Sequence, residues 1–260
     1  MRCVAFVYDF PHWKSWHGIA HLIACGLFSE LLAIGAPYVP LEAGASPNRH
    51  KTRHIPSGAA SSACGPSRAR YISAAHDSLE CTDILSAFRA DIGVILGARA
   101  LPERVLESAD CPILNVHPGV LPQNRGLDAV AWAVQRGWPQ GVTVHQITPR
   151  LDAGPIMSMA ILESLAPSDC IMKIVACINA LQLVLLMTTL HRVAAEDGSC
   201  RGIEIQHPGM YHSRYYGSDI DLMDRLASYN AAYPNILGKW MREEARLVER
   251  LGERLSLVEG

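Results

Sequence analysis

The sequence predicts an α/β protein with a mainly parallel β-sheet that is covered by helices on both faces. Short apolar segments typical of buried strands alternate along the chain with longer segments of helical periodicity. The 260 residues, of which 49% are hydrophobic, suffice for one sizeable core with an extension. We therefore expect a main domain over residues 1–200 and a short C-terminal extension over residues 201–260 that ends in a helix.

The N-terminal part of the chain predicts a strand, a helix and a second strand. Residues 3–8 form an apolar, strand-like run that leads into a loop rich in aromatic and histidine side chains. Apolar residues then recur at helical spacing over residues 18–34, and residues 37–41 could form a short strand. Residues 42–70 have no periodicity and consist mostly of small, turn-forming and basic residues, so they are interpreted as a long loop or insertion.

Helices and strands alternate through the middle of the chain. We expect helices over residues 78–89, 102–107 and 128–135, and strands over residues 92–96, up to Asn115, and over residues 142–147. Ligands of parallel sheets bind at the carboxyl ends of the strands. The end of the strand at Asn115 is therefore the expected location of a site.

The segment over residues 170–193 is apolar around most of its circumference. A membrane-spanning helix needs roughly 20 apolar residues, so this segment is long enough to be considered as one. Four polar residues interrupt it, so we favour a buried helix, with a subunit contact as one location, and expect no membrane association. These residues are Lys173, Asn179, Gln182 and His191. The charged tail over residues 238–257 is predicted to be a helix that packs on the core or on a second subunit.

Composition and charge argue against several classes of protein. The formal net charge is −2 and there is no extended basic stripe, so a nucleic-acid partner is not expected. The eight cysteines are scattered, without a Cys-x-x-Cys pair or a compact Cys/His set, so we expect no metal site and free thiols in a reducing cytoplasm. The N-terminus lacks the basic and then apolar layout of a signal peptide, which also indicates a cytoplasmic location.

The most informative stretch is residues 113–126, where an apolar run ends in Asn115 and His117 before a Pro-Gly break. Residues two apart in a strand project to the same side, so these two side chains should project together. An amide donor beside a titratable imidazole can hold a developing oxyanion and transfer a proton. Asp152 lies in a sharp turn further along the chain and could fold back onto His117. The alternative for the first two residues is a strand-end Asn and a hydrogen-bonded core His.

These motifs resemble those of the formyltransferase family, whose members take a one-carbon group from 10-formyltetrahydrofolate. The family pattern Asn-x-His-Pro-Ser-x-Leu-Pro-x-x-Arg-Gly is met over residues 115–126, except that Gly119 replaces the Ser. Gly-Val-Thr-x-His at residues 141–145 and Asp-x-Gly-Pro-Ile at residues 152–156 follow in the family order. The resemblance is strong over residues 91–156 and weaker on either side.

The resemblance implies a Rossmann-like formyltransferase fold and assigns roles to several residues. Asn115 and His117 would stabilise the oxyanion of a tetrahedral intermediate, and Asp152 would orient His117, favour its charged form and take the proton. His145 lies on the family motif but is interpreted as a packed core histidine. The backbone and loop residues implied to cradle the pterin of the donor are Gly97, Ala98, Arg99, Ala100, Leu101, Leu151 and Gly154.

The loop after the first strand bears on the identity of the acceptor. Family members that act on glycinamide ribonucleotide have a glycine-rich, phosphate-binding turn there, whereas residues 9–17 contain no glycine, so a phosphoribosyl acceptor is disfavoured. Trp13 and Trp16 could instead stack on an acceptor ring or line a channel, or simply cover the core. Arg125 is interpreted as shaping a turn, with a substrate contact as the alternative. The loop over residues 42–70 could order as a lid over the acceptor.

The sequence therefore predicts an enzyme that transfers a formyl group from 10-formyltetrahydrofolate to a small-molecule amine. The acceptors considered are an amino-sugar nucleotide, an amino acid and a hydroxylamine. Methionyl-tRNA is disfavoured because the tRNA enzymes of the family have a longer C-terminal barrel domain. The alternatives are a 10-formyltetrahydrofolate hydrolase and a folate-binding homologue without turnover. A homodimer is compatible with the helices expected over residues 170–193 and 238–257, each of which could contact a second subunit.

Overall fold

The computed structural model describes residues 1–39, 58–205, 210–212 and 219–256. A seven-stranded sheet forms its centre, with β1 (Arg2–Tyr8), β2 (Glu30–Ala36), β3 (Arg70–Ser73), β4 (Ile92–Ile95), β5 (Ile113–His117), β7 (Gly141–Gln146) and β8 (Ile156–Ile161). The strand order is β3-β2-β1-β4-β5-β7-β8. Neighbouring strands from β3 to β5 are parallel, whereas β7 is antiparallel to both β5 and β8. The predicted α/β class with a mainly parallel sheet is confirmed.

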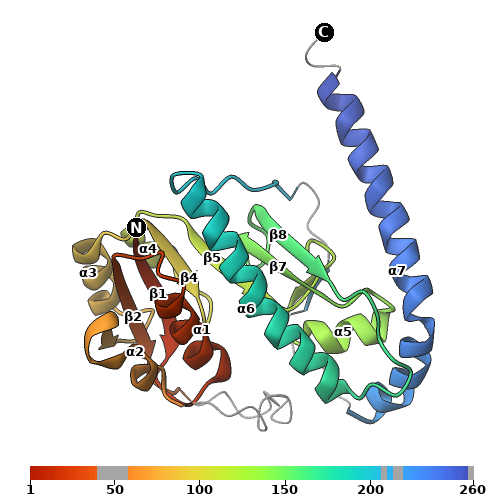
Figure 1. The fold of residues 1–260 in the computed structure, drawn as a ribbon, viewed down its shortest axis with the longest axis horizontal. Helices are drawn as coiled ribbons and strands as arrows, with labels where there is room; N and C mark the ends of the chain where they lie inside the picture. Colours follow the sequence, from red (N-terminus) through yellow and green to blue (C-terminus); the bar gives the residue numbers. More distant parts are fainter. Residues whose placement is uncertain (40–57, 206–209, 213–218, 257–260) are drawn as a thin grey trace.

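Helices cover both faces of this sheet, as predicted (Figure 1). The described helices are α1 (Trp13–Ala24), α2 (Ala60–Arg68), α3 (Leu79–Phe88), α4 (Glu103–Ala109), α5 (Ala129–Arg136), α6 (Ile171–Ala195) and α7 (Asp219–Ser256). Helices α1, α2 and α6 bury apolar side chains in one core cluster, and α3 and α4 bury theirs in a second cluster. A small second sheet joins β6 (Asn124–Gly126) to β9 (Met210–His212) in parallel.

The helix predicted over residues 18–34 and the strand predicted over residues 37–41 are wrong in their boundaries. Helix α1 begins and ends earlier, the chain turns at Gly26 with a φ of +67°, and β2 follows. The strand β2 is buried on both sides, with Leu31 and Leu32 only 4% and 1% exposed. A strand buried on both faces has a continuous apolar run, which periodicity cannot distinguish from a buried helix.

The loop predicted over residues 42–70 is wrong where the structure describes it. Residues 40–57 lie outside the described residues, and the predicted lid falls largely on them. Beyond them, α2 and the edge strand β3 replace the expected loop. Helix α2 is kinked at Gly65, which has a φ of +63°, and it buries Ala60 and Cys64 against the core. Its small residues give too weak an apolar period for the helix to be predicted from the sequence.

The elements predicted for the middle of the chain are confirmed. Helix α3 begins after Ser78, whose hydroxyl accepts a hydrogen bond from the backbone N–H of Cys81. Strands β4, β5 and β7 and helices α4 and α5 lie at the predicted positions to within a few residues. The strand β5 lies between β4 and β7, so its carboxyl end opens near the middle of the sheet edge. The eight cysteines are free thiols, as expected.

The apolar segment over residues 170–193 forms helix α6, which packs one face on the sheet. Ile174, Ile178 and Leu186 are among the buried residues of that face, whereas Val184 on the other face is 62% exposed. Among the described helices, α6 is long and apolar enough to cross a membrane, a test that the core helix of a protein also passes. The face of α6 that contacts β7 and β8 is buried, which agrees with the prediction of a buried helix for that face.

Helix α7 contains the predicted C-terminal helix but begins much earlier in the chain. Its first half packs on the domain, with Leu222, Leu226, Tyr229 and Tyr233 buried. The Tyr233 hydroxyl donates to the carbonyl oxygen of Leu162 at 2.8 Å. The second half of α7 runs clear of the rest of the molecule (Figure 1). The division into residues 1–200 and 201–260 stays a prediction.

Candidate active site

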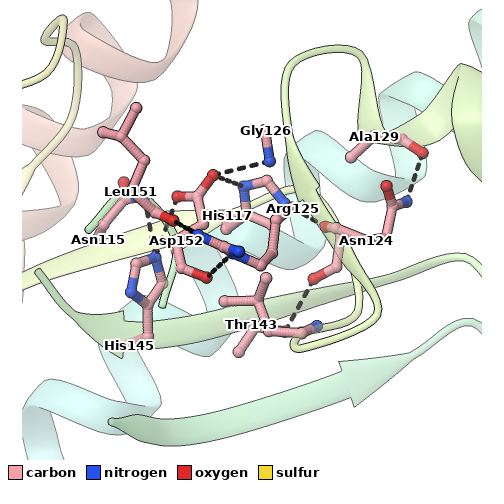
Figure 2. A network of polar contacts seen from close by, with 12 residues as sticks. Asn115, His117, Asn124, Arg125, Gly126, Ala129, Thr143, His145, Leu151 and Asp152 are labelled. Atoms are coloured by element: carbon pink, nitrogen blue, oxygen red, sulfur yellow. Dashed lines mark hydrogen bonds and ion pairs between the residues drawn. The ribbon is translucent and has the colours of Figure 1, made fainter. Parts of the chain in front are cut away.

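Four polar side chains converge at the carboxyl end of β5 (Figure 2). Asn115 and His117 lie two residues apart on β5, and antiparallel pairing with β7 places His145 opposite Asn115. Asp152 comes from the turn between β7 and β8 and has a φ of 46°, a left-handed conformation that Asp adopts more readily than most residues. Two segments that are separate in the sequence therefore meet at one site, as predicted.

The carboxylate of Asp152 lies between two imidazoles. Its Oδ2 atom is 3.6 Å from Nδ1 of His117, and its Oδ1 atom is 3.5 Å from Nε2 of His145. The backbone N–H of Gly126 donates to Oδ2 at 2.9 Å. The guanidinium of Arg125 holds the same turn, because its Nε donates to the Asp152 carbonyl oxygen at 2.9 Å. Asp152 is therefore fixed in place by groups from β5, β6 and β7.

Burial controls the protonation of His117. Its side chain is 4% exposed, and burial lowers the pKa of His117 below its usual value although the Asp152 carboxylate acts in the opposite direction. Burial therefore opposes the charged form of His117 that was expected from the sequence, and the charge of this ring stays a prediction. Burial also opposes ionisation of Asp152, but His117, His145 and the Gly126 N–H outweigh it and hold the pKa of Asp152 well below its usual range. Asp152 is ionised at pH 7.

The ring partners assign the tautomers of both histidines. Nε2 of His117 is 2.8 Å from the carbonyl oxygen of Asn124, and a carbonyl only accepts, so Nε2 carries the proton and donates. Nδ1 of His145 donates to the carbonyl oxygen of Gln146 at 2.8 Å for the same reason. Nε2 of His145 lies 3.2 Å from Nδ2 of Asn115 and 3.5 Å from Oδ1 of Asp152, so this ring nitrogen contacts both side chains. His145 therefore orients the Asn115 amide, a role that its interpretation as a packed histidine did not include.

Gly119, the one departure from the family pattern, allows the contact between His117 and Asn124. A Cβ atom at Gly119 would lie 2.7 Å from both Nε2 of His117 and the carbonyl oxygen of Asn124. It would also lie 2.9 Å from Cβ of Ala129. A serine at this position would force the imidazole or the backbone to move. The glycine and the observed orientation of His117 are therefore linked.

A cavity of about 330 Å³ opens beside Asn115. Its walls come from the loop after β1 and the start of α1, from the loop after β4, and from the buried face of α6. Pro118, which follows β5, and Asp128, which precedes α5, also line the cavity. Small-molecule sites in proteins are typically concave and of ~300–1,000 Å³, so the size suits a small ligand.

The residues predicted to contact the donor fall in different places. Gly97 and Ala98 line the cavity. Arg99 donates to the carbonyl oxygen of Val39 at 2.8 Å. Leu101 packs against the second core cluster, and Leu151 is 42% exposed on the turn that carries Asp152. Ala100 follows Arg99 in the same loop, and Gly154 packs closely on the backbone of Gln146. Their contacts with the pterin stay predictions.

The residues predicted to contact the acceptor also lie in different parts of the structure. Trp13 is 7% exposed and lines the cavity. Trp16 stacks edge-on with His17, with ring centroids 4.7 Å apart, and lies outside the cavity wall. Arg125 is buried and binds the turn at Asp152, which agrees with the turn-shaping role that the sequence favoured.

Three residues that line the cavity were not predicted from the sequence as site residues. Lys14 is turned inward, and its ammonium donates to the carbonyl oxygen of Val116 at 2.8 Å. Asn179 and Gln182 are buried on α6 and face the same cavity. The signal was present in the sequence as two amides at i and i+3 within an apolar helix, a spacing that places them on one face. From the sequence alone, these two amides were interpreted only as interruptions of the apolar segment.

The comparison with known families decides the classification. The sequence model described as Formyl transferase matches residues 42–180, which is more than half of the chain. The chain belongs to the formyl transferase family. The matched residues include Asn115, His117 and Asp152, which this family member brings together at the end of β5.

Similar proteins extend this finding. The methionyl-tRNA formyltransferase of Chlorobium chlorochromatii is 29% identical over 118 residues, which cover 45% of this chain and 37% of that protein. This formyl transferase family member thus spans little more than a third of the length of that relative. A sugar N-formyltransferase structure from Shewanella sp. has a TM-score of 0.61 and 16% identity, with 88% of each chain covered.

A Helicobacter canadensis N-formyltransferase, solved in complex with folinic acid and dTDP-3-aminofucose, has a TM-score of 0.59 and 13% identity. The match covers 82% of this chain and 71% of that chain. At these identities, the two structural matches establish a shared fold.

Proposed function

We propose that the protein transfers a formyl group from 10-formyltetrahydrofolate to the amine of a small-molecule acceptor. The observation that carries the proposal is the convergence of Asn115, His117 and Asp152 beside a cavity at the carboxyl end of β5. Membership of the formyl transferase family supports the reaction type. The folinic acid bound to the Helicobacter canadensis protein supports a folate donor.

The reaction needs a group that stabilises negative oxygen and a group that accepts a proton. The acceptor amine attacks the formyl carbon, and the carbonyl oxygen becomes an oxyanion of a tetrahedral intermediate. Asn115 has two amide N–H groups, and the one that does not face His145 can donate to this oxygen. The Nε2–H of His117 becomes a second donor if its ring exchanges the Asn124 carbonyl oxygen for the substrate oxygen. The two donors would stabilise charge that develops only during the reaction.

Asp152 is the proposed proton acceptor. Attack leaves a positively charged nitrogen in the intermediate, and this nitrogen is a much stronger acid than the free ammonium. An ionised carboxylate can take that proton directly or through one water molecule. The proton then passes to the donor nitrogen as its bond to the formyl carbon breaks, which yields tetrahydrofolate and the N-formyl product. His117 and Asp152 thus have separate roles.

The loop after β1 supports an acceptor without a phosphoribosyl group. Phe10 stacks on Tyr8 with ring centroids 4.8 Å apart, and His12 lies edge-on to Tyr8 at 5.0 Å. These rings fill the loop, whereas a phosphate-binding turn needs exposed backbone N–H groups and close approach, which glycine allows. An amino-sugar nucleotide, an amino acid and a hydroxylamine remain the proposed classes of acceptor.

The direct test is to incubate the purified protein with 10-formyltetrahydrofolate and a panel of amines, and to follow tetrahydrofolate release and product mass. We expect release that depends on an amine and a product heavier than that amine by one formyl group. Release at the same rate without any amine would instead identify a hydrolase. Absence of release over a broad panel, with folate binding retained, would contradict an enzymatic function.

A further inference from the structure

The cavity beside Asn115 contains a buried cation with few protein partners. Lys14 reaches inward from the first turn of α1, and its ammonium donates to the carbonyl oxygen of Val116 at 2.8 Å. Among the described residues, that carbonyl is the hydrogen-bond partner of the Lys14 ammonium. An ammonium has three N–H donors, so two of them remain for a ligand. Val116 lies between Asn115 and His117, which places the cation one residue away from each.

A second donor faces the same cavity from α6. Asn179 is 8% exposed, and its Oδ1 accepts from Nε2 of Gln182 at 3.2 Å. Its Nδ2 is buried and has no hydrogen-bond partner among the described residues. A buried polar group without a partner costs free energy, so an amide in this state indicates a ligand atom that completes it. The missing partner is an acceptor, such as a carboxylate oxygen.

The charge of Lys14 also calls for a partner. Burial lowers the pKa of Lys14 to about 8, with Asp152 acting in the opposite direction, so the ammonium is still mostly charged at pH 7. Burial and then Lys14 itself lower the pKa of His12 to about 4, so this ring in the cavity wall is neutral. A buried cation with one carbonyl partner is unfavourable unless a ligand brings an anion.

We propose that the acceptor is a small amine with a carboxylate a few bonds from its nitrogen, and that Lys14 and Asn179 bind this carboxylate. The inference rests on the proposed function and assigns its substrate class. Lys14 binds the carbonyl oxygen of the residue between Asn115 and His117, which favours an acceptor with its anion close to the reacting amine. The cavity of about 330 Å³ accommodates a molecule of the size of an amino acid.

The surrounding charges favour a carboxylate over a phosphate. Lys14 is the cation on the described cavity wall, and the same wall includes the acidic residue Asp128. A phosphate monoester near neutral pH carries more than one negative charge, which would exceed the charge of Lys14 and lie close to Asp128 and Asp152. A carboxylate has a single charge and two oxygens, which match the ammonium of Lys14 and the amide of Asn179.

Steady-state kinetics with matched acceptors tests the inference. Each pair consists of an amino acid and the carboxamide with the same side chain. A phosphate-bearing amine is measured beside them. We expect kcat/KM for the amino acid to exceed that for the carboxamide by about 30-fold or more, mostly through KM, as charge-assisted hydrogen bonds predict. Lys14→Met should lower kcat/KM for the amino acid far more than for the carboxamide, so that the ratio of the two falls to about threefold or less. Lys173→Met, at an exposed lysine paired with Asp169, is the control and should change neither value.

A second variant and a binding measurement complete the test. Asn179→Asp places a negative charge at the position of the donor and should lower kcat/KM for the amino acid more than kcat/KM for the carboxamide. Calorimetry with the N-formyl amino acid and its amide measures the same preference without turnover.

Two results would overturn the inference and leave the proposed function unaffected. The first is equal kcat/KM for the amino acid and the carboxamide in wild type. The second is a preference for the amino acid that Lys14→Met does not change. A preference for the phosphate-bearing amine that disappears in Lys14→Met would overturn the assignment of a carboxylate as the bound anion. If no amine is formylated, the result counts against the proposed function itself. Calorimetry would then still test whether the site binds a carboxylate.

Discussion

At the scale of single residues, Asp152 has the most constrained position in the site. Two imidazoles and the Gly126 N–H surround its carboxylate, and Arg125 fixes its backbone. The sequence predicted that Asp152 would meet His117, because motifs that recur in a known order imply a shared geometry. It could not predict that burial lowers the pKa of His117, because the depth of burial depends on the whole fold. The orientation of Asn115 by His145 was missed for the same reason.

Replacing Asp152 with Asn tests its role as proton acceptor. Asn tolerates the left-handed conformation at φ 46° and can accept from the Gly126 N–H, so the fold should be retained. Formyl transfer should fall by ~100-fold or more, because an amide cannot take the proton. The measurement is kcat/KM for the best acceptor, with circular dichroism to confirm folding. A loss smaller than about tenfold would demote Asp152 to a structural residue.

His12 gives a prediction for the dependence of stability on pH. Burial lowers its pKa from 6.5 to about 4 in the folded protein, so between these values the unfolded chain binds a proton that the folded chain does not. Stability should therefore fall as the pH drops from 6.5 to 4, by up to about 3 kcal/mol from this residue. His12→Asn keeps a side chain that can cap α1 but removes the titration. Urea denaturation at several pH values should show a smaller loss in His12→Asn, and identical losses would contradict the assignment.

At the scale of elements, the predictable segments are those with clear signals at their ends. Helix α3 has a serine cap, and β5 ends at a Pro-Gly break, so both were predicted within a few residues. Strand β2 was missed because burial on both faces removed its alternation. Helix α2 was missed because its small residues and the kink at Gly65 hide the helical period. Local signals therefore locate an element best where its ends are marked by a cap or a turn.

Tyr233 tests whether the first half of α7 is part of the folded domain. Its buried hydroxyl donates to Leu162 and accepts from the backbone N–H of Gln140 at 3.1 Å. Tyr233→Phe leaves both backbone groups without this partner, so the free energy of unfolding should fall by about 1–3 kcal/mol. Chemical denaturation measures the change, with Tyr38→Phe, at a side chain 64% exposed, as the control. Equal stability of Tyr233→Phe and wild type would mean that α7 does not dock as described.

At the scale of the whole molecule, the sheet order brings the site together. The motif residues on β5 and the turn after β7 meet because β7 pairs directly with β5. The fold class, the meeting of Asn115, His117 and Asp152, and the family could be predicted from the sequence. The cavity could not, because it needs α1 and α6 to face each other across the sheet edge. Lys14 and Asn179 can be recognised as cavity residues only from that long-range packing.

The central claim is that the polar cluster at the end of β5 performs formyl transfer, and His117→Ala tests it most directly. The measurement is the initial rate of N-formyl product from 10-formyltetrahydrofolate and the best amine of the panel, compared with His21→Ala at an exposed histidine. We predict a loss of about 100-fold to 10,000-fold in His117→Ala with thermal unfolding still cooperative, and a rate near wild type in His21→Ala. A rate for His117→Ala within about threefold of wild type would contradict the account.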